Sequence, residues 1–172
     1  NLSLRVHRAL SWLARAEQLG LQNDADGQFI LLWIAFNAAY ATEIDEKYRD
    51  SEQQTFRGFL DKLTQLDAGS RRFDALAWTE FPKSIRVLLD NPYVFADFWK
   101  FQNGTLPEAN WKASFAAANK AAHVALGRQD TVTVLSIVLS RIYTLRNQLI
   151  HGGATWNGSV NREQLRDCVN LM

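Results

Sequence analysis

Two side chains near the end of the sequence, Arg146 and His151, could act together on a phosphodiester. An RNA backbone attacked by its own 2′-hydroxyl needs a group to accept the hydroxyl proton, a cation to stabilise charge on the phosphorane, and a proton for the leaving 5′ oxygen. Histidine titrates near neutral pH and suits either proton transfer. Arginine stays charged and binds phosphate oxygens in a fork. The pair therefore predicts RNA cleavage that needs no metal ion.

The spacing of the two residues limits how they can meet. Five positions on an ideal helix correspond to a rotation of about 140°, so Arg146 and His151 do not share a face. They can meet if the helix unwinds toward Gly152, if the arginine stem reaches round, or if a second copy of the helix supplies the missing group. Asn147, about 40° from His151, could orient the imidazole or contact phosphate. Alternatively, Arg146 pairs with an internal acid and His151 only caps the helix.

Both residues belong to a segment, residues 131–156, whose apolar positions cover most of a helical circumference and predict a core helix. One polar strip crosses it at spacings of three or four residues, formed by Thr133, Ser136, Ser140, Thr144, Asn147 and His151. Leaving such groups buried and unpaired costs about 1–3 kcal/mol each. We therefore expect the strip, including Thr144, to face a wet cleft or another polar surface. The glycines at 152 and 153 should end the helix.

A second buried helix is predicted from a cap at Asn23 or Asp24 to about Ile44. Asn37 and Tyr40 lie three positions apart on it and share one face. Either both side chains are satisfied inside the core, or both line the same cleft as the polar strip.

The rest of the chain reads as further helices, with no βαβ alternation and no convincing strand. The sequence therefore predicts an all-α fold, a single domain over residues 1–172 built as an up-and-down bundle of six to eight helices. Adjacent Arg71 and Arg72 predict a solvated helix start, and the aromatic residues between Tyr93 and Phe101 predict core or subunit contacts rather than base stacking. The expected helical segments are 3–20, 52–67, 71–81, 84–89, 93–101, 107–127 and a last helix from Arg162. The first should pack through Val6, Leu10, Leu13 and then Ala16 or Glu17.

Composition restricts the remaining function classes. The formal charge is +1, so any site for a polyanion must be a local arrangement of arginines, among which Arg162 is a candidate. The single cysteine, Cys168, excludes an intrachain disulfide and a cysteine zinc cluster within one chain, and indicates a reducing cytoplasm. The three histidines show no ligand spacing, so we expect neither a metal site nor a cofactor.

The longest apolar run, Phe29–Phe36, would span about 12 Å as a helix, which is too short for a membrane core of roughly 30 Å. The chain starts at Asn1 and stops within a helical pattern at Met172, which suggests truncation at both ends.

The string RNQLIHG at residues 146–152 resembles the motif of the HEPN superfamily, an Arg followed by a polar residue and, after four to six intervening residues, a His near the end of a long helix. The string LWIAFNAAY at residues 32–40 is similar to the second helix of bacterial HEPN proteins. The resemblance implies a helical bundle whose homodimer joins two motifs in one cleft. It also implies a metal-independent endoribonuclease, a hydrolase common among toxin–antitoxin and phage-defence proteins, often silenced by an antitoxin or nucleotidyltransferase partner.

Under that resemblance, Arg146 and His151 are catalytic and Asn147 supports them, while Asn37, Tyr40, Thr144 and Arg162 are candidates for contact with RNA. The alternative is a non-catalytic HEPN-like module that recognises a partner protein, RNA or a nucleotide. A metallo-enzyme of the bundle type would need inward Glu and Glu-x-x-His pairs, and no such pair occurs in the sequence.

Overall fold

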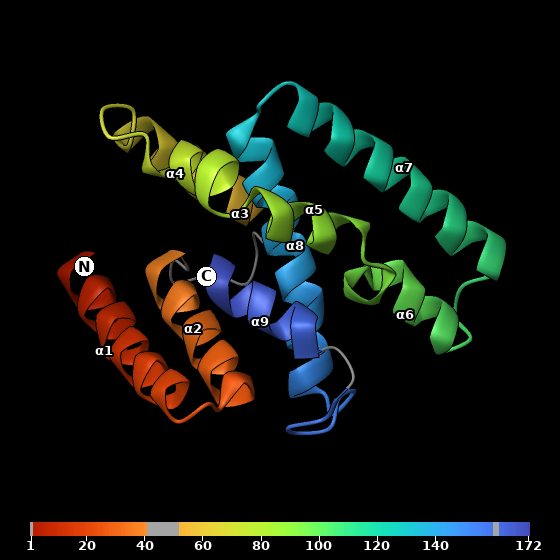
Figure 1. The fold of residues 1–172 in the computed structure, drawn as a ribbon, viewed down its shortest axis with the longest axis horizontal. Helices are drawn as coiled ribbons and strands as arrows, with labels where there is room; N and C mark the ends of the chain where they lie inside the picture. Colours follow the sequence, from red (N-terminus) through yellow and green to blue (C-terminus); the bar gives the residue numbers. More distant parts are fainter. Residues whose placement is uncertain (1, 41–51, 160–161) are drawn as a thin grey trace, which may run out of the picture. The chain divides into compact units, whose positions relative to one another are not determined.

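The computed structural model describes residues 2–40, 52–159 and 162–172. Within these ranges the chain forms nine α-helices and no strand, which confirms the all-α class (Figure 1). The helices outnumber the six to eight expected, because turns split the middle of the chain more often than its periodicity indicates. Two compact units form: Asn1–Arg49 with Arg146–Met172, and Asp50–Leu145. The single-domain organisation stays a prediction.

The first unit contains α1 (Leu2–Leu21), α2 (Ala25–Tyr40), the last turn of α8 and α9 (Arg162–Leu171). Helices α1 and α2 form an antiparallel hairpin (Figure 1). Asp24 is the cap of α2, because its Oδ1 accepts a hydrogen bond of 3.0 Å from the backbone N–H of Gly27. Asn23, with φ of 59°, forms the turn before it. The predicted extension of α2 to Ile44 lies outside the described residues.

The face of α1 that packs on α2 agrees with the expected one only in part. Ala16, one of the positions expected to pack, is fully buried, whereas Val6, Leu10 and Leu13 are exposed. Nearby, a methyl group added at Gly20 would lie only 2.6 Å from Nε2 of Gln28. Small residues thus let the two helices approach closely, and the packed face of α1 includes Ala16 but not the larger apolar residues expected beside it.

The second unit contains the remaining helices. Pro82 takes the first position of α5, where its missing N–H costs nothing, and thereby limits the π-helical turn before it. The expected segment 71–81 is therefore a single turn of α-helix followed by a π turn. The elements are α3 (Glu52–Leu66), α4 (Arg72–Ala75), the π turn (Leu76–Glu80), α5 (Pro82–Asp90), a 3-10 turn (Pro92–Val94), α6 (Ala96–Gln102), α7 (Glu108–Gly127) and α8 (Thr131–Ile150).

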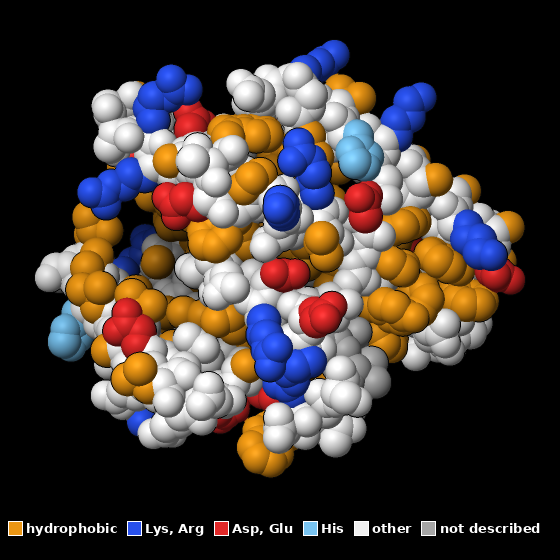
Figure 2. All heavy atoms as spheres, viewed as in Figure 1, with side chains coloured by type: hydrophobic (Ala, Val, Ile, Leu, Met, Phe, Trp, Pro, Cys, Tyr) orange, Lys and Arg blue, Asp and Glu red, His pale blue; other side chains and the backbone are white. Residues whose placement is uncertain are grey.

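The aromatic residues of α6 pack against α7. The ring of Phe98 lies 5.2 Å from that of Trp111, and Phe95 lies 5.2 Å from Phe115, both edge to face. Such pairs stabilise a core beyond the area they bury. These contacts confirm the packing role expected for this cluster, and Figure 2 shows hydrophobic side chains gathered over this part of the second unit.

Helix α8 provides the core face predicted for it. Val134, Val138, Ile142 and Leu145 are each at most 2% exposed. No helix in the described ranges has the length and hydropathy needed to cross a membrane.

Candidate functional site

The end of α8 fixes the position of His151. The N–H of Gly153 donates to the carbonyl of Gln148 at 2.7 Å, and the N–H of Gly152 donates to that of Leu149 at 3.3 Å. Gly152 has φ of 72°. This pair of bonds around a left-handed glycine is a Schellman motif, in which His151 is the cap residue that follows Ile150, the last residue of α8. The two glycines thus end the helix as expected.

The helix does not unwind before His151. The N–H of His151 still donates to the carbonyl of Asn147 at 3.0 Å, the bond of a regular α-helix. Of the three ways to bring Arg146 and His151 together, unwinding is therefore wrong for this structure.

Arg146 instead reaches round the helix. Its Nη1 donates a hydrogen bond of 2.8 Å to Oδ1 of Asn147. On the helix circumference Asn147 lies between Arg146 and His151. The half-buried Arg146 is thus bonded to the residue that lies between it and His151 on the helix circumference. His151 itself is exposed.

We expect Gly152→Ala to destabilise the protein by about 1 kcal/mol, because a Cβ at positive φ is strained. Urea unfolding followed by tryptophan fluorescence measures the change. Gly58→Ala is the matched control: Gly58 lies inside α3 with open space around it, so alanine there should stabilise slightly. Equal stability of the two variants would contradict the role given to Gly152.

A hollow of about 400 Å³ lies in the same unit. Leu149 and Ala154, which flank His151 in sequence, line it together with Gly27 and Ile30 of α2. Trp156 also lines it and is 72% exposed. Trp156 was not among the predicted site residues, because its only sequence signal is that of a lone tryptophan in a polar loop.

Arg162 is held by an acid that the sequence analysis missed. Its Nη1 lies 2.7 Å from Oδ2 of Asp26, and its Nε donates to the carbonyl of Gly158 at 3.0 Å. The same Oδ2 accepts from the backbone N–H of Asn157 at 3.1 Å. Both side chains of the pair are mostly buried. This network joins α2 and α9 to the loop after His151, and it favours a structural role for Arg162 over contact with RNA.

Asn37 and Tyr40 lie in the second half of α2. Tyr40 is buried and its ring is 4.7 Å from that of Phe36, whereas Asn37 is half-buried. Neither lines the hollow beside Trp156. Asp26 precedes Asn37 by eleven residues, roughly 16 Å along the helix, so Arg162 and Asn37 are held at opposite ends of α2. For Tyr40, burial favours the core interpretation.

Thr144 belongs to the second unit. Its hydroxyl donates to the carbonyl of Ser140 at 3.2 Å. In the same way, the hydroxyl of Ser140 donates to the carbonyl of Ser136, and that of Ser136 to the carbonyl of Val132. Together with Thr133, the residues with these hydroxyls line a groove of about 570 Å³. The first part of the polar strip thus faces a groove, as expected, while its hydroxyl protons are satisfied by the helix itself.

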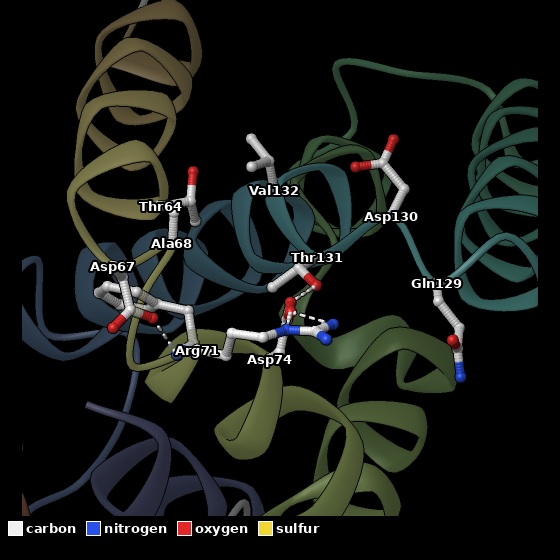
Figure 3. Close-up of a pocket in the computed structure, with 10 residues that line it drawn as sticks. Thr64, Asp67, Ala68, Arg71, Asp74, Gln129, Asp130, Thr131 and Val132 are labelled. Atoms are coloured by element: carbon white, nitrogen blue, oxygen red, sulfur yellow. Dashed lines mark hydrogen bonds and ion pairs between the residues drawn. The ribbon is translucent and has the colours of Figure 1, made fainter.

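Acidic residues surround another hollow of the second unit, of about 310 Å³ (Figure 3). Oδ2 of Asp74 pairs with Arg71, and Oδ1 accepts from the hydroxyl of Thr131. Asp130 accepts from the hydroxyl and N–H of Thr133. These bonds hold the pKa of Asp74 and of Asp130 below its usual value, chiefly through Thr131 and Thr133 respectively. Both carboxylates stay ionised at neutral pH and are poor general bases.

We expect the pKa of Asp74 to rise toward its ordinary value of 3.8 in Thr131→Val, because the largest cause of its depression is removed. A depressed carboxyl pKa stabilises the fold above the unfolded value, and that contribution disappears as pH falls through the folded value. The variant should therefore have a lower free energy of unfolding at neutral pH, and that free energy should fall less than in the parent as the pH is lowered. NMR titration of the Asp74 carboxyl and urea unfolding at several pH values measure both effects.

Thr64→Val is the matched control, because Thr64 lines the same hollow but its hydroxyl bonds to the carbonyl of Leu60. An unchanged Asp74 titration in Thr131→Val would overturn the assignment.

No group of three or more His, Cys, Asp and Glu side chains in the described residues could hold a metal ion. Comparison with known proteins found no matching family model, no matching curated protein and no matching solved structure.

Proposed function

We propose that this chain is a metal-independent endoribonuclease of the HEPN type, which acts as a homodimer with a composite cleft. One observation carries the proposal: on the last turn of α8 the guanidinium of Arg146 is held by Asn147, the residue between Arg146 and His151 on the helix circumference. The exposed imidazole follows at the glycine-terminated end of the same helix. A cation and a proton-transfer group are thus brought to one end of an otherwise apolar helix.

In the proposed reaction, the 2′-oxygen attacks phosphorus while an imidazole takes its proton. The bond from phosphorus to the 5′ oxygen breaks, that oxygen receives a proton, and a 2′,3′-cyclic phosphate remains. Arg146 stabilises the charge on the phosphorane, and the amide nitrogen of Asn147 is placed to donate to a phosphate oxygen. Each electron pair and proton is accounted for without a metal ion.

A dimer would supply the second proton-transfer group. His151 is the only histidine in the motif, and the reaction needs one group to take a proton and one to give it. Because Thr133 to Thr144 face a groove of the second unit, we place the contact between copies at the last turn of α8. Ile150 on that turn is 47% exposed, which supports this choice.

Trp156 is suited to hold a base. Its exposed ring lines the same hollow as Leu149 and Ala154, and Trp156 lies five residues after His151. Stacking on an aromatic ring contributes to binding single-stranded RNA without sequence preference. We further propose a toxin or phage-defence role in the cytoplasm, with an antitoxin or nucleotidyltransferase as the silencing partner.

The test is cleavage of a single-stranded RNA by the purified protein in EDTA, with the ends analysed by mass spectrometry. We expect cyclic phosphate on the upstream product and no cleavage of an RNA with a 2′-deoxy residue at the scissile position. Cleavage of that deoxy substrate, or activity abolished by EDTA, would reject the mechanism.

The alternative function is a non-catalytic HEPN-like module that binds a partner protein. The exposed apolar residues of α1, among them Leu2, Val6 and Leu10, favour it, because such patches often mark contact surfaces. In that case neither the parent nor His151→Ala cleaves RNA, and the substitution lowers assembly or the melting temperature.

A further inference from the structure

Arg141 on α8 is a buried cation that forms no ion pair with an acid among the residues that the structure describes. The residue is 3% exposed, and its Nε and Nη2 have no hydrogen-bond partner within the described ranges. Its guanidinium carbon lies 4.5 Å from the ring centre of Phe95 and 5.5 Å from that of Phe115. Aromatic faces attract a cation but accept none of its N–H groups in strong hydrogen bonds. Buried donors of this kind are rarely left without an acceptor, so we expect a bound group to supply acceptors for Arg141.

Asp90, an acid whose charge acts on Arg141, does not supply this acceptor. The charge of Asp90 attracts Arg141, yet its carboxylate bonds to His123 at 3.2 Å and to Asn119 at 3.3 Å. Burial lowers the pKa of Arg141 to about 10, so the side chain still carries its charge at neutral pH.

Arg141 lines the groove of about 570 Å³ in the second unit. This volume lies in the range of small-molecule sites, roughly 300–1,000 Å³. A second cation, Arg57, also lines it, and none of the described residues around the groove is acidic. Its walls are otherwise apolar or carry hydroxyls, represented by Val94, Ala118, Ala121, Ile137 and Ser140.

We propose that this groove binds a phosphate monoester of mononucleotide size, with the phosphate on Arg141. A guanidinium fork matches phosphate oxygens, and its bonds to a dianion in a partly dry groove are stronger than in water. The hydroxyl protons of Ser136, Ser140 and Thr144 already bond to the helix backbone, so the arginines supply the donors for the anion. The site is independent of the proposed nuclease activity.

Titration calorimetry of the full chain tests the site with four probes: AMP, ribose 5-phosphate, adenosine and inorganic phosphate. We expect AMP and ribose 5-phosphate to bind, adenosine to bind at least about tenfold more weakly, and inorganic phosphate to bind more weakly than AMP. Equal binding of adenosine and AMP overturns the role of the phosphate. Equal binding of inorganic phosphate and AMP overturns the nucleotide-sized ligand, and no binding of any probe overturns the site.

Two variants locate the ligand. Arg141→Met keeps an unbranched chain between Phe95 and Phe115 and should lose at least about tenfold in AMP affinity. Ala121→Phe leaves the arginine in place but fills the groove, and should lose AMP binding as well. Ala117→Phe is its control, because Ala117 is exposed on the same helix and does not line the groove. Unchanged AMP affinity in either Arg141→Met or Ala121→Phe overturns the assignment.

Discussion

His151→Ala is expected to lower kcat for RNA cleavage by about 10²–10⁴-fold, the range over which a positioned proton-transfer group contributes. The exposed side chain lies directly after the last residue of α8, and the Schellman bonds that end the helix come from backbone groups of Gly152 and Gly153. Its removal should therefore leave the fold intact. Single-turnover cleavage of a fluorescent RNA and the melting temperature measure the two effects separately.

His123→Ala is the matched control for this substitution. His123 is also an exposed helical histidine, bonded to Asp90 on the surface of the second unit. It should cleave like the parent. If His151→Ala also cleaves like the parent, then the imidazole has no part in the reaction and the nuclease assignment fails.

The sequence predicted the position of the motif well, because the signals there are local. Glycine at positive φ and Asp24 at a helix start act through the backbone of neighbouring residues, so their consequences can be read along the chain. At these two positions the expected and observed helix ends agree. By contrast, α5 begins at Pro82, two residues before the expected start at residue 84.

Predictions failed where a contact joins distant parts of the chain. Asp26 and Arg162 are 136 residues apart, so no spacing rule connects them. On α1 the expected face is only partly correct, because Ala16 is buried but Val6, Leu10 and Leu13 are exposed. The burial of Arg141 was missed for a related reason: the rings that cover its guanidinium come from distant positions, Phe95 just before α6 and Phe115 on α7. Sequence patterns describe the residues of one helix, whereas contacts between distant helices depend on how the helices pack.

Asp26→Ala is expected to destabilise the protein by about 3–5 kcal/mol, because removing one member of a buried ion pair leaves the other charged and unpaired. Asp26 makes the 2.7 Å pair with Arg162 and accepts the N–H of Asn157. Its place in the first turn of α2 adds a favourable interaction with the helix dipole. Urea unfolding measures the loss. Glu163→Ala, which removes an exposed acid from the first turn of α9, should cost less than about 1 kcal/mol.

A double variant separates the loss of the ion pair from the other consequences of removing the Asp26 carboxylate. Asp26→Leu with Arg162→Met replaces both charges by apolar groups of similar size, and such replacements of buried pairs are often neutral. We expect it to be at least about 2 kcal/mol more stable than Asp26→Ala, with the remaining deficit due to the unpaired N–H of Asn157. If the double variant is as unstable as Asp26→Ala, the pair is not the source of the stability.

Because Asn157 lies six residues after His151, the loop that follows the motif should also become less ordered in Asp26→Ala. This variant should therefore cleave RNA more slowly than the parent even below its melting temperature.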